Sequence, residues 1–190
     1  MKKILCILLL LLTGCSSKTS MIEIQKHVYV EKEFKDSWLE TNEFGDSYIK
    51  EELQGGYHYH FDQQFLEIFF NTGGEIELYN YSIKKNDLII SGEMIPPKTI
   101  RLVHPHLDNV TSEGVIIHEL GHYFDEKHQF SSSKQFTELY KKYRTLFNQK
   151  TKKEYFAECF KEYVGGHQEK VKPFHSYMKT ITQKIRQKNK

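Results

Sequence analysis

The spacing of hydrophobic residues divides the chain into a strand-rich first half, up to about residue 109, and a helical second half. In the first half, aromatic and β-branched residues form runs typical of strands. The predicted strands cover residues 57–71, 75–83, 87–91 and 99–104. The Thr-Gly-Gly sequence at 72–74 separates the first two runs and predicts a hairpin turn. A helix is predicted over residues 32–43, with Phe34, Trp38 and Leu39 on one face.

Helices are predicted after residue 111, because hydrophobic residues there recur every three or four positions. They cover approximately residues 112–127, 134–147, 151–165 and 173–185. Gly165 and Gly166 supply a C-terminal cap for the third helix, and Pro173 suits the first turn of the fourth. Strands followed by helices are the pattern of an α+β fold.

Composition narrows the class of protein. The 190 residues suit a single domain and are 38% hydrophobic and 27% charged, with a formal net charge of +2. This near-neutral balance argues against electrostatic nucleic-acid binding, and a mean hydropathy of −0.61 excludes a polytopic membrane protein. Three cysteines are too few for a disulfide framework. We therefore expect a globular domain, monomeric and without a nucleic-acid partner.

The N-terminus has the pattern of an export signal. Lys2 and Lys3 precede an apolar run at residues 4–12, and small and polar residues follow it. A run of this length is too short to cross a membrane as a helix, which takes roughly 20 residues. The predicted organisation is therefore a signal peptide over residues 1–14 and a folded domain over residues 21–190.

The signal ends in Leu12-Thr13-Gly14-Cys15, which resembles the lipobox of bacterial lipoproteins. The resemblance implies that the Cys15 thiol is diacylglycerated and the peptide is cut immediately before this residue. It also implies that residues 15–20 form a short tether and that the domain is held at the outer face of the cell membrane. Two or more acyl chains anchor a protein stably where a single chain does not. The alternative is a plain secreted protein in which Cys15 happens to stand at the cleavage point.

The main candidate for chemistry is the sequence HELGH at residues 118–122. On a helix, His118 and His122 lie on one face, where both imidazoles can reach one zinc ion, and Glu119 can serve as general base. The alternative is a solvated polar face on a surface helix. The apolar run at 115–117 instead predicts a buried helix, whose polar groups a metal would satisfy.

A catalytic zinc usually takes a third protein ligand, and the carboxylates of a later helix could supply it. Glu154 and Glu158 lie four residues apart on one face of the predicted third helix. Glu154 also fits a capping box that begins at Thr151, so both a capping role and a ligand role are open to it. Glu158 could equally be a solvated partner of Lys161.

Two motifs together resemble the catalytic domain of anthrax lethal factor and the related secreted Pro-Pro endopeptidases. They are HELGHYFD at residues 118–125 and EYFAECF at residues 154–160. The resemblance implies a zincin-like fold, in which a small mixed sheet is followed by an active-site helix and a helical C-terminal lobe. It extends from about residue 115 through the last predicted helix.

The same resemblance assigns roles to five residues. His118, His122 and Glu154 would be the ligands of one Zn²⁺ ion, and Glu119 would be the catalytic base of peptide-bond hydrolysis. Glu158 would hydrogen-bond a ligating histidine and fix its tautomer.

The chain departs from the family at one position. Family members carry a tyrosine seven residues before the ligand glutamate, where this chain has Phe147. Tyr143, one helical turn earlier, is the candidate for a replacement oxyanion donor, and its alternative is a core position. Loss of such a donor can lower the rate about 10²–10³-fold, so this departure bears on activity rather than on metal binding.

Two segments of the first half carry secondary predictions. Tyr57-His58-Tyr59-His60 would place both histidines on one face of a strand, where an exposed or hydrogen-bonded surface is favoured over a second metal site. The strand at 99–103 is expected at the sheet edge, where an extended substrate could pair with it.

The sequence as a whole predicts a lipid-anchored zinc metalloendopeptidase that acts on peptides or proteins at the cell surface. The alternative is a catalytically weak zinc-binding surface lipoprotein that acts as an adhesion or immunity module. Phe147 favours this alternative, whereas Glu119 favours the enzyme, because a binding module needs no general base.

Overall fold

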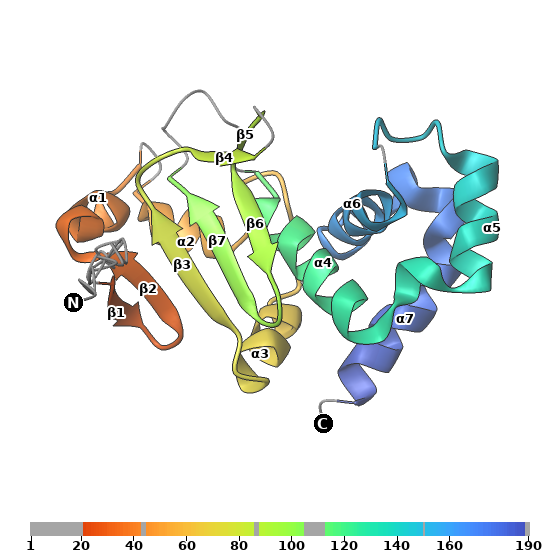
Figure 1. Cartoon of the computed structure of the whole chain (residues 1–190), viewed down its shortest axis with the longest axis horizontal. Helices are drawn as coiled ribbons and strands as arrows, with labels where there is room; N and C mark the ends of the chain where they lie inside the picture. The colour runs from red at the N-terminus through yellow and green to blue at the C-terminus, as the bar shows by residue number, and fades with distance from the viewer. Residues whose placement is uncertain (1–20, 43–44, 86–87, 105–112, 150, 189–190) are drawn as a thin grey trace, which may run out of the picture.

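The computed structural model describes residues 21–42, 45–85, 88–104, 113–149 and 151–188. The signal peptide, Cys15 and the tether lie outside these residues. The described part of the chain is a mixed α+β structure with the sheet in the first half and a helical lobe in the second, as predicted (Figure 1). No helix within the described ranges is long and apolar enough to span a membrane.

The main sheet has five strands in the order β1-β2-β3-β7-β6. The strands are β1 (Met21–Gln25), β2 (Val28–Glu31), β3 (Glu75–Tyr79), β7 (Thr99–Val103) and β6 (Gly92–Ile95). The three central strands, β2, β3 and β7, are parallel, and the outer strands β1 and β6 are antiparallel to their neighbours. The small mixed sheet is therefore confirmed. A separate hairpin joins β4 (Ile83–Lys85) and β5 (Leu88–Ile90).

Alternation along the central strands determines which face of the sheet is buried. Ile76 and Leu78 of β3 pair in register with Ile100 and Leu102 of β7, and all four are fully buried. The intervening Glu77 lies beside Arg101 on the opposite face, where the two side chains are 2.9 Å apart. One face therefore packs into the core and the other carries charge, as expected for strands with period two.

The prediction of a strand over residues 57–71 is wrong. Residues 64–71 form helix α3 (Gln64–Asn71), which buries Phe65, Leu66, Ile68 and Phe69. These positions follow helical spacing, and the aromatic content that suggested a strand is used for packing instead. The predicted hairpin turn is the end of this helix, where Gly73 has φ +80° and Gly74 N–H donates to the Phe69 carbonyl.

The helix predicted over residues 32–43 is shorter than expected. A 3₁₀ turn (Lys32–Phe34) leads into α1 (Lys35–Leu39), and Trp38 is fully buried while Leu39 is largely exposed. Strands β1 and β2 and helix α2 (Tyr48–Leu53) were not predicted. These elements are only 5, 4 and 6 residues long, which is too short to show a clear hydrophobic periodicity.

The prediction that residues 99–103 form an edge strand is also wrong. Strand β7 lies between β3 and β6, so both of its sides are paired. The edge strand on this side of the sheet is β6, which lies next to helix α4 (Val115–His128) (Figure 1).

The helical half follows the predicted order. Helix α4 is followed by α5 (Lys134–Tyr143), α6 (Lys152–Val164) and α7 (His175–Gln187), with 3₁₀ turns at Phe130–Ser132 and Gln168–Phe174. Helix α6 packs along α4 at very close range. A Cβ atom added at Gly121 would lie 2.9 Å from the Ala157 Cα. This close approach, which Gly121 suggested, brings the polar faces of α4 and α6 together.

Candidate metal centre

Helix α4 carries the two histidines on one face and buries the other. Gly114, with φ +73°, precedes the helix, and its carbonyl accepts a hydrogen bond from the His118 N–H. Ile117 and Leu120 are fully buried on the core side. The His118 and His122 rings lie one turn apart, with centroids separated by 4.9 Å. The apolar side thus fixes the direction in which the imidazoles point.

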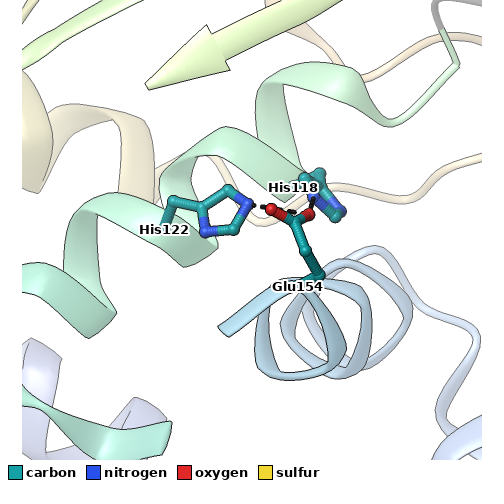
Figure 2. A group of neighbouring side chains, drawn as sticks. All are labelled: His118, His122 and Glu154. Atoms are coloured by element: carbon teal, nitrogen blue, oxygen red, sulfur yellow. Dashed lines mark hydrogen bonds and ion pairs between the residues drawn. The ribbon is translucent and has the colours of Figure 1, made fainter. Parts of the chain in front are cut away.

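Helix α6 places Glu154 opposite both imidazoles (Figure 2). Glu154 Oε2 lies 3.2 Å from His118 Nε2 and 3.2 Å from His122 Nε2. Tetrahedral ligands about 2.0–2.1 Å from one zinc ion lie roughly 3.3 Å from each other, so these separations suit a shared ion. The three side chains could therefore hold a metal ion.

The capping role and the possible ligand role of Glu154 involve different atoms. The Thr151 hydroxyl accepts a hydrogen bond from the Glu154 backbone N–H at 3.2 Å, which caps α6. The Glu154 carboxylate is turned towards the histidines. The helix is therefore capped by the threonine alone, and the glutamate side chain is available to a metal.

The three side chains form a strongly coupled charge cluster. Hydrogen bonds with His118 and His122 hold the pKa of Glu154 well below its usual range. Burial on its own would lower the pKa of His118, but its hydrogen bonds with Glu154 and Glu158 outweigh burial and raise that pKa to about 9. Both shifts refer to the metal-free protein. The cluster favours an ionised carboxylate, which is the form that binds a cation.

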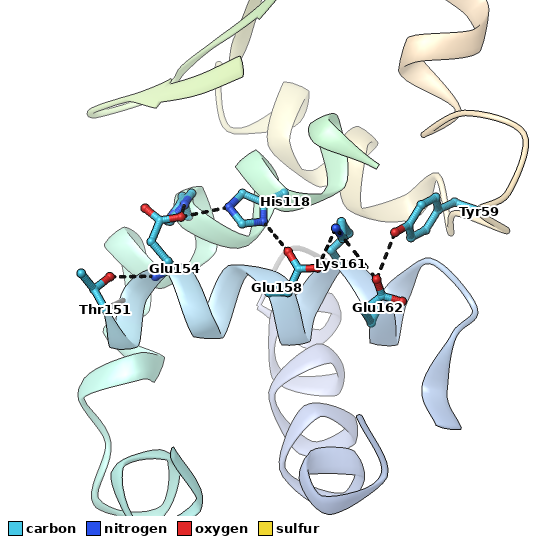
Figure 3. A network of polar contacts seen from close by, with 8 residues as sticks. Tyr59, His118, Thr151, Glu154, Glu158, Lys161 and Glu162 are labelled. Atoms are coloured by element: carbon cyan, nitrogen blue, oxygen red, sulfur yellow. Dashed lines mark hydrogen bonds and ion pairs between the residues drawn. The ribbon is translucent and has the colours of Figure 1, made fainter. Parts of the chain in front are cut away.

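Glu158 lies behind His118, on the side away from Glu154 (Figure 3). Its Oε2 is 3.2 Å from His118 Nδ1, and its Oε1 is 2.7 Å from the Lys161 ammonium. Burial opposes ionisation of Glu158, yet hydrogen bonds with His118 and Lys161 lower its pKa. Glu158 thus contacts both the histidine and the lysine, but the prediction of a solvated pair is wrong, because the Glu158 and Lys161 side chains are only 14% and 16% exposed.

Glu119 is buried next to the cluster. It is only 7% exposed, and burial raises the pKa of its carboxyl, against the opposing influence of His118 and His122. A backbone hydrogen bond from Met94 on edge strand β6 reaches the same carboxyl. A carboxyl with a raised pKa can exchange a proton at neutral pH more readily than a solvated one.

These groups line one cleft of about 660 Å³ between β6 and the two helices. Gly92 and Met94 contribute from the strand, His118 and Glu119 from α4, and Lys161 from α6. A cleft of this volume lies within the range of small-molecule and peptide sites. It contains charged groups of both signs beside the possible metal position.

The structure does not bring Tyr143 to this cleft. The Tyr143 ring packs against Phe174, with centroids 6.0 Å apart, and its backbone carbonyl accepts a hydrogen bond from the Tyr155 hydroxyl. Phe147 packs against Tyr155, at 5.3 Å between centroids. Tyr143 is therefore half-buried against the core of the helical lobe, close to its alternative prediction, and the described residues that line the cleft include no tyrosine.

The pairing of Glu158 with Lys161, three residues later, was among the sequence predictions, and the structure confirms the ion pair at 2.7 Å. Sequence reasoning missed the contact of Glu162 with the first half of the chain. Tyr59, whose hydroxyl donates to Glu162 Oε1 at 3.1 Å, carried no local signal because the two residues are 103 positions apart. Its segment was predicted as a strand, which further concealed the contact.

Comparisons with known proteins do not assign the chain to a family. No family model matches the chain, and a search of curated proteins finds no similar sequence. The likeness to the lethal factor catalytic domain therefore depends on the two motifs at residues 118–125 and 154–160 alone.

Proposed function

We propose that this protein is a zinc-dependent metalloendopeptidase with a zincin-like fold. The observation that carries the proposal is the convergence of His118, His122 and Glu154 at one point beside a buried Glu119 and an open cleft. A metal site that serves only structure is usually closed, with four protein ligands. Three donors at the wall of a cleft instead suit a site that keeps a position for water or substrate.

Zinc is the metal that this donor set fits best. Two imidazole nitrogens and one carboxylate oxygen form a common ligand set of catalytic zinc. Calcium and magnesium prefer all-oxygen sites, so the two histidines argue against them. When bound, zinc supplies Lewis acidity and lowers the pKa of a coordinated water towards neutrality.

The chain's own residues would perform the proton transfers and hold the substrate. Glu119 accepts a proton from the attacking water and later delivers it to the leaving amine. Because a backbone hydrogen bond from Met94 reaches Glu119, this part of edge strand β6 faces the cleft. An extended peptide could therefore pair with β6, rather than with β7 as the sequence suggested.

Cleavage would take place at the cell surface. The lipobox-like sequence at residues 12–15 supports a diacylglycerol anchor on Cys15 at the outer face of a bacterial membrane. A tether over residues 15–20 would keep the domain close to that membrane. Peptides and proteins at the surface are therefore the proposed substrates.

The second candidate is a zinc-binding module with little activity. One observation favours it: Tyr143 and Phe147 both pack in the helical lobe, so neither supplies an oxyanion donor. Such a module could bind a surface partner through the same cleft, as an adhesion or immunity protein. The buried Glu119 next to the possible metal position favours the enzyme.

The substitution Glu119→Gln separates the two candidates. Purified residues 15–190 and this variant are incubated with a peptide library, and cleavage sites are identified by mass spectrometry. Loss of a general base typically lowers the rate about 10²–10⁴-fold, and we expect a loss in this range with one zinc still bound. Glu126→Gln is the control, because Glu126 lies on the same helix and lines the same cleft with a largely exposed side chain. Equal behaviour of wild type and Glu119→Gln, each holding one zinc, would contradict the enzyme.

A further inference from the structure

A chain of polar side chains extends from His118 to the first half of the molecule (Figure 3). His118 Nδ1 lies 3.2 Å from Glu158, and Glu158 lies 2.7 Å from the Lys161 ammonium. The same ammonium is 3.9 Å from Glu162, which also accepts a hydrogen bond from the Tyr59 hydroxyl at 3.1 Å and contacts His167 and Lys170 at 3.0 and 3.1 Å. The contacts of His118 with Glu158 and of Tyr59 with Glu162 join different elements, and Lys161 contacts both glutamates of α6.

The members of this chain are largely removed from water. The side chains of Glu158, Lys161 and Glu162 are 14%, 16% and 5% exposed. A carboxylate in such surroundings needs a cation or several hydrogen bonds to stay ionised. Lys161 is the cation nearest to Glu158, and Glu162 is its second carboxylate. Without Lys161, the carboxylate behind His118 would lose the cation that holds it from the side away from the histidine.

The position of Glu158 decides how His118 is oriented. Because Glu158 contacts Nδ1, a metal held by His118 would be bound through Nε2, the nitrogen that faces Glu154. A Glu158 side chain turned away from Nδ1 would no longer hold the imidazole in this orientation. Orientation of the possible metal ligand therefore depends on a lysine that does not touch it.

We propose that Lys161 is a positioning residue for the metal centre. Through Glu158 it fixes the orientation of His118, while Glu162 and Tyr59 hold the lysine in place. This inference rests on the proposed zinc site and adds to it a residue that acts from behind the ligands.

Tyr59 supplies the far end of the chain from the segment that the sequence analysis singled out for its histidines. Its ring is packed closely against two glycines, since a Cβ atom at Gly165 would lie 2.2 Å from the ring and one at Gly114 would lie 2.9 Å from it. The neighbouring His60 N–H donates to the Gly165 carbonyl at 2.9 Å. Burial and Glu162 raise the pKa of Tyr59, so its hydroxyl stays protonated and donates. The segment thus ties the first half of the chain to both metal-site helices.

Lys170 provides a matched control. Its ammonium lies 3.1 Å from Glu162, so it binds the same carboxylate as Lys161, but its side chain is 58% exposed. Among the ion pairs of the described residues, none joins Lys170 to Glu158. If both ion pairs served stability alone, removal of either lysine would change zinc affinity to a similar extent. A positioning role predicts a larger loss of zinc affinity when Lys161 is removed.

The test compares zinc affinities of Lys161→Met, Lys170→Met, Glu158→Gln and the double variant Glu158→Gln/Lys161→Met. Affinity is measured by competition with a chromophoric chelator, and thermal unfolding of the metal-free proteins reports folding. Loss of an outer partner of a metal ligand typically weakens binding about 10–100-fold, and we expect about 10-fold for Lys161→Met and less than about 2-fold for Lys170→Met. Lys161→Arg should recover part of the loss.

The double variant tests the route of the effect. If Lys161 acts through Glu158, replacing Lys161 in a protein that already carries Glu158→Gln should weaken zinc binding little further. The two changes would interrupt the same pathway. Histidine ¹⁵N NMR of the zinc-loaded wild type should show His118 protonated at Nδ1, and Lys161→Met should broaden or shift that signal.

The outcomes distinguish this inference from the proposed function. Equal zinc affinity in Lys161→Met and Lys170→Met, or full additivity in the double variant, overturns the positioning role while zinc-dependent cleavage by the wild type stands. A wild type that takes up no zinc overturns both. If Lys161→Met fails to fold, Tyr59→Phe replaces it, with an expected loss of about 2-fold or more in affinity and none in the Lys170→Met control.

Discussion

Glu154 is at a position where two local requirements coincide. It occupies the first turn of α6, where an acidic side chain is favoured by the helix dipole, and its carboxylate lies 3.2 Å from two imidazoles. Thr151 caps the helix through its hydroxyl, so the carboxylate is not needed for capping. A capping motif and a metal-ligand motif can therefore overlap in sequence while their atoms do different work.

Substitutions at Thr151 and Glu154 should affect different quantities, the first mainly stability and the second mainly metal binding. Thr151→Ala removes the cap and should lower the free energy of unfolding of the metal-free protein by about 1 kcal/mol, with zinc affinity nearly unchanged. Glu154→Gln should weaken zinc binding by more than the roughly 100-fold that loss of an outer partner can cost. Urea unfolding and chelator competition measure the two quantities. Similar stability losses with intact zinc affinity in both variants would show that Glu154 is only a capping residue.

The affinity for zinc should rise with pH. In the metal-free protein the pKa of His118 is raised to about 9, so below that pH a metal must displace a proton from this imidazole. One displaced proton makes the affinity increase about tenfold per pH unit up to about pH 9. Competition titrations between pH 6.5 and pH 8.5, corrected for protonation of the chelator, measure the slope. An affinity that stays flat across this interval would mean that His118 is already neutral.

At the scale of the elements, the site depends on how closely α4 and α6 approach. Gly121 faces the Ala157 backbone and the Phe160 Cβ, which a Cβ atom at position 121 would meet at 2.9 and 3.2 Å. His118 and His122 lie on either side of this glycine in α4, as Glu154 and Glu158 do around Ala157 in α6. The contact between small residues therefore fixes the distance between the two sets of polar groups.

Gly121→Ala should destabilise the protein and weaken its metal site. Alanine improves helix propensity by about 1 kcal/mol, but overpacking against a backbone atom costs about 1–3 kcal/mol. We expect a net loss of about 1 kcal/mol in the free energy of unfolding, with lower zinc affinity because the two helices move apart. Gln183→Ala, at an exposed position in α7, is the control and should change either quantity little. A stabilised Gly121→Ala variant with unchanged zinc affinity would contradict the close packing.

The helical elements were predictable from sequence, and the first half much less so. Long amphipathic runs placed α4, α5, α6 and α7 within a few residues of their observed bounds. The aromatic run at 57–71 misled the prediction because Phe65 and Phe69 are buried at helical spacing, whereas strand propensity ignores spacing. The edge position of β6 could not be predicted, since strand order depends on contacts between distant segments.

The residues of the candidate site were likewise predictable from the sequence only in part. His118, His122 and Glu154 are each recognisable from a local motif, and the structure brings them together. Tyr59 is not, because its contact with Glu162 joins residues 103 positions apart. Tyr143 was expected at the site from an analogy, but α5 directs its ring into the lobe that contains Phe174.

At the scale of the whole molecule, the two halves supply different parts of the proposed activity. Edge strand β6 lies beside helix α4 (Figure 1). Residues of β6 line one side of the cleft, and Glu154 of α6 supplies the third group that could hold a metal ion. Tyr59 and His60 join the halves at the ends of α4 and α6. The cleft is therefore formed only when the full domain is folded.

The central claim is that one zinc ion at the His118-His122-Glu154 site makes this domain a peptidase. The most direct measurement is a zinc titration of chelator-treated residues 15–190, with cleavage of a library-derived peptide recorded at each addition. We expect no cleavage without metal and a linear rise to a plateau at one equivalent of zinc. Cleavage by the metal-free protein, or no cleavage with one zinc bound at this site, would contradict it.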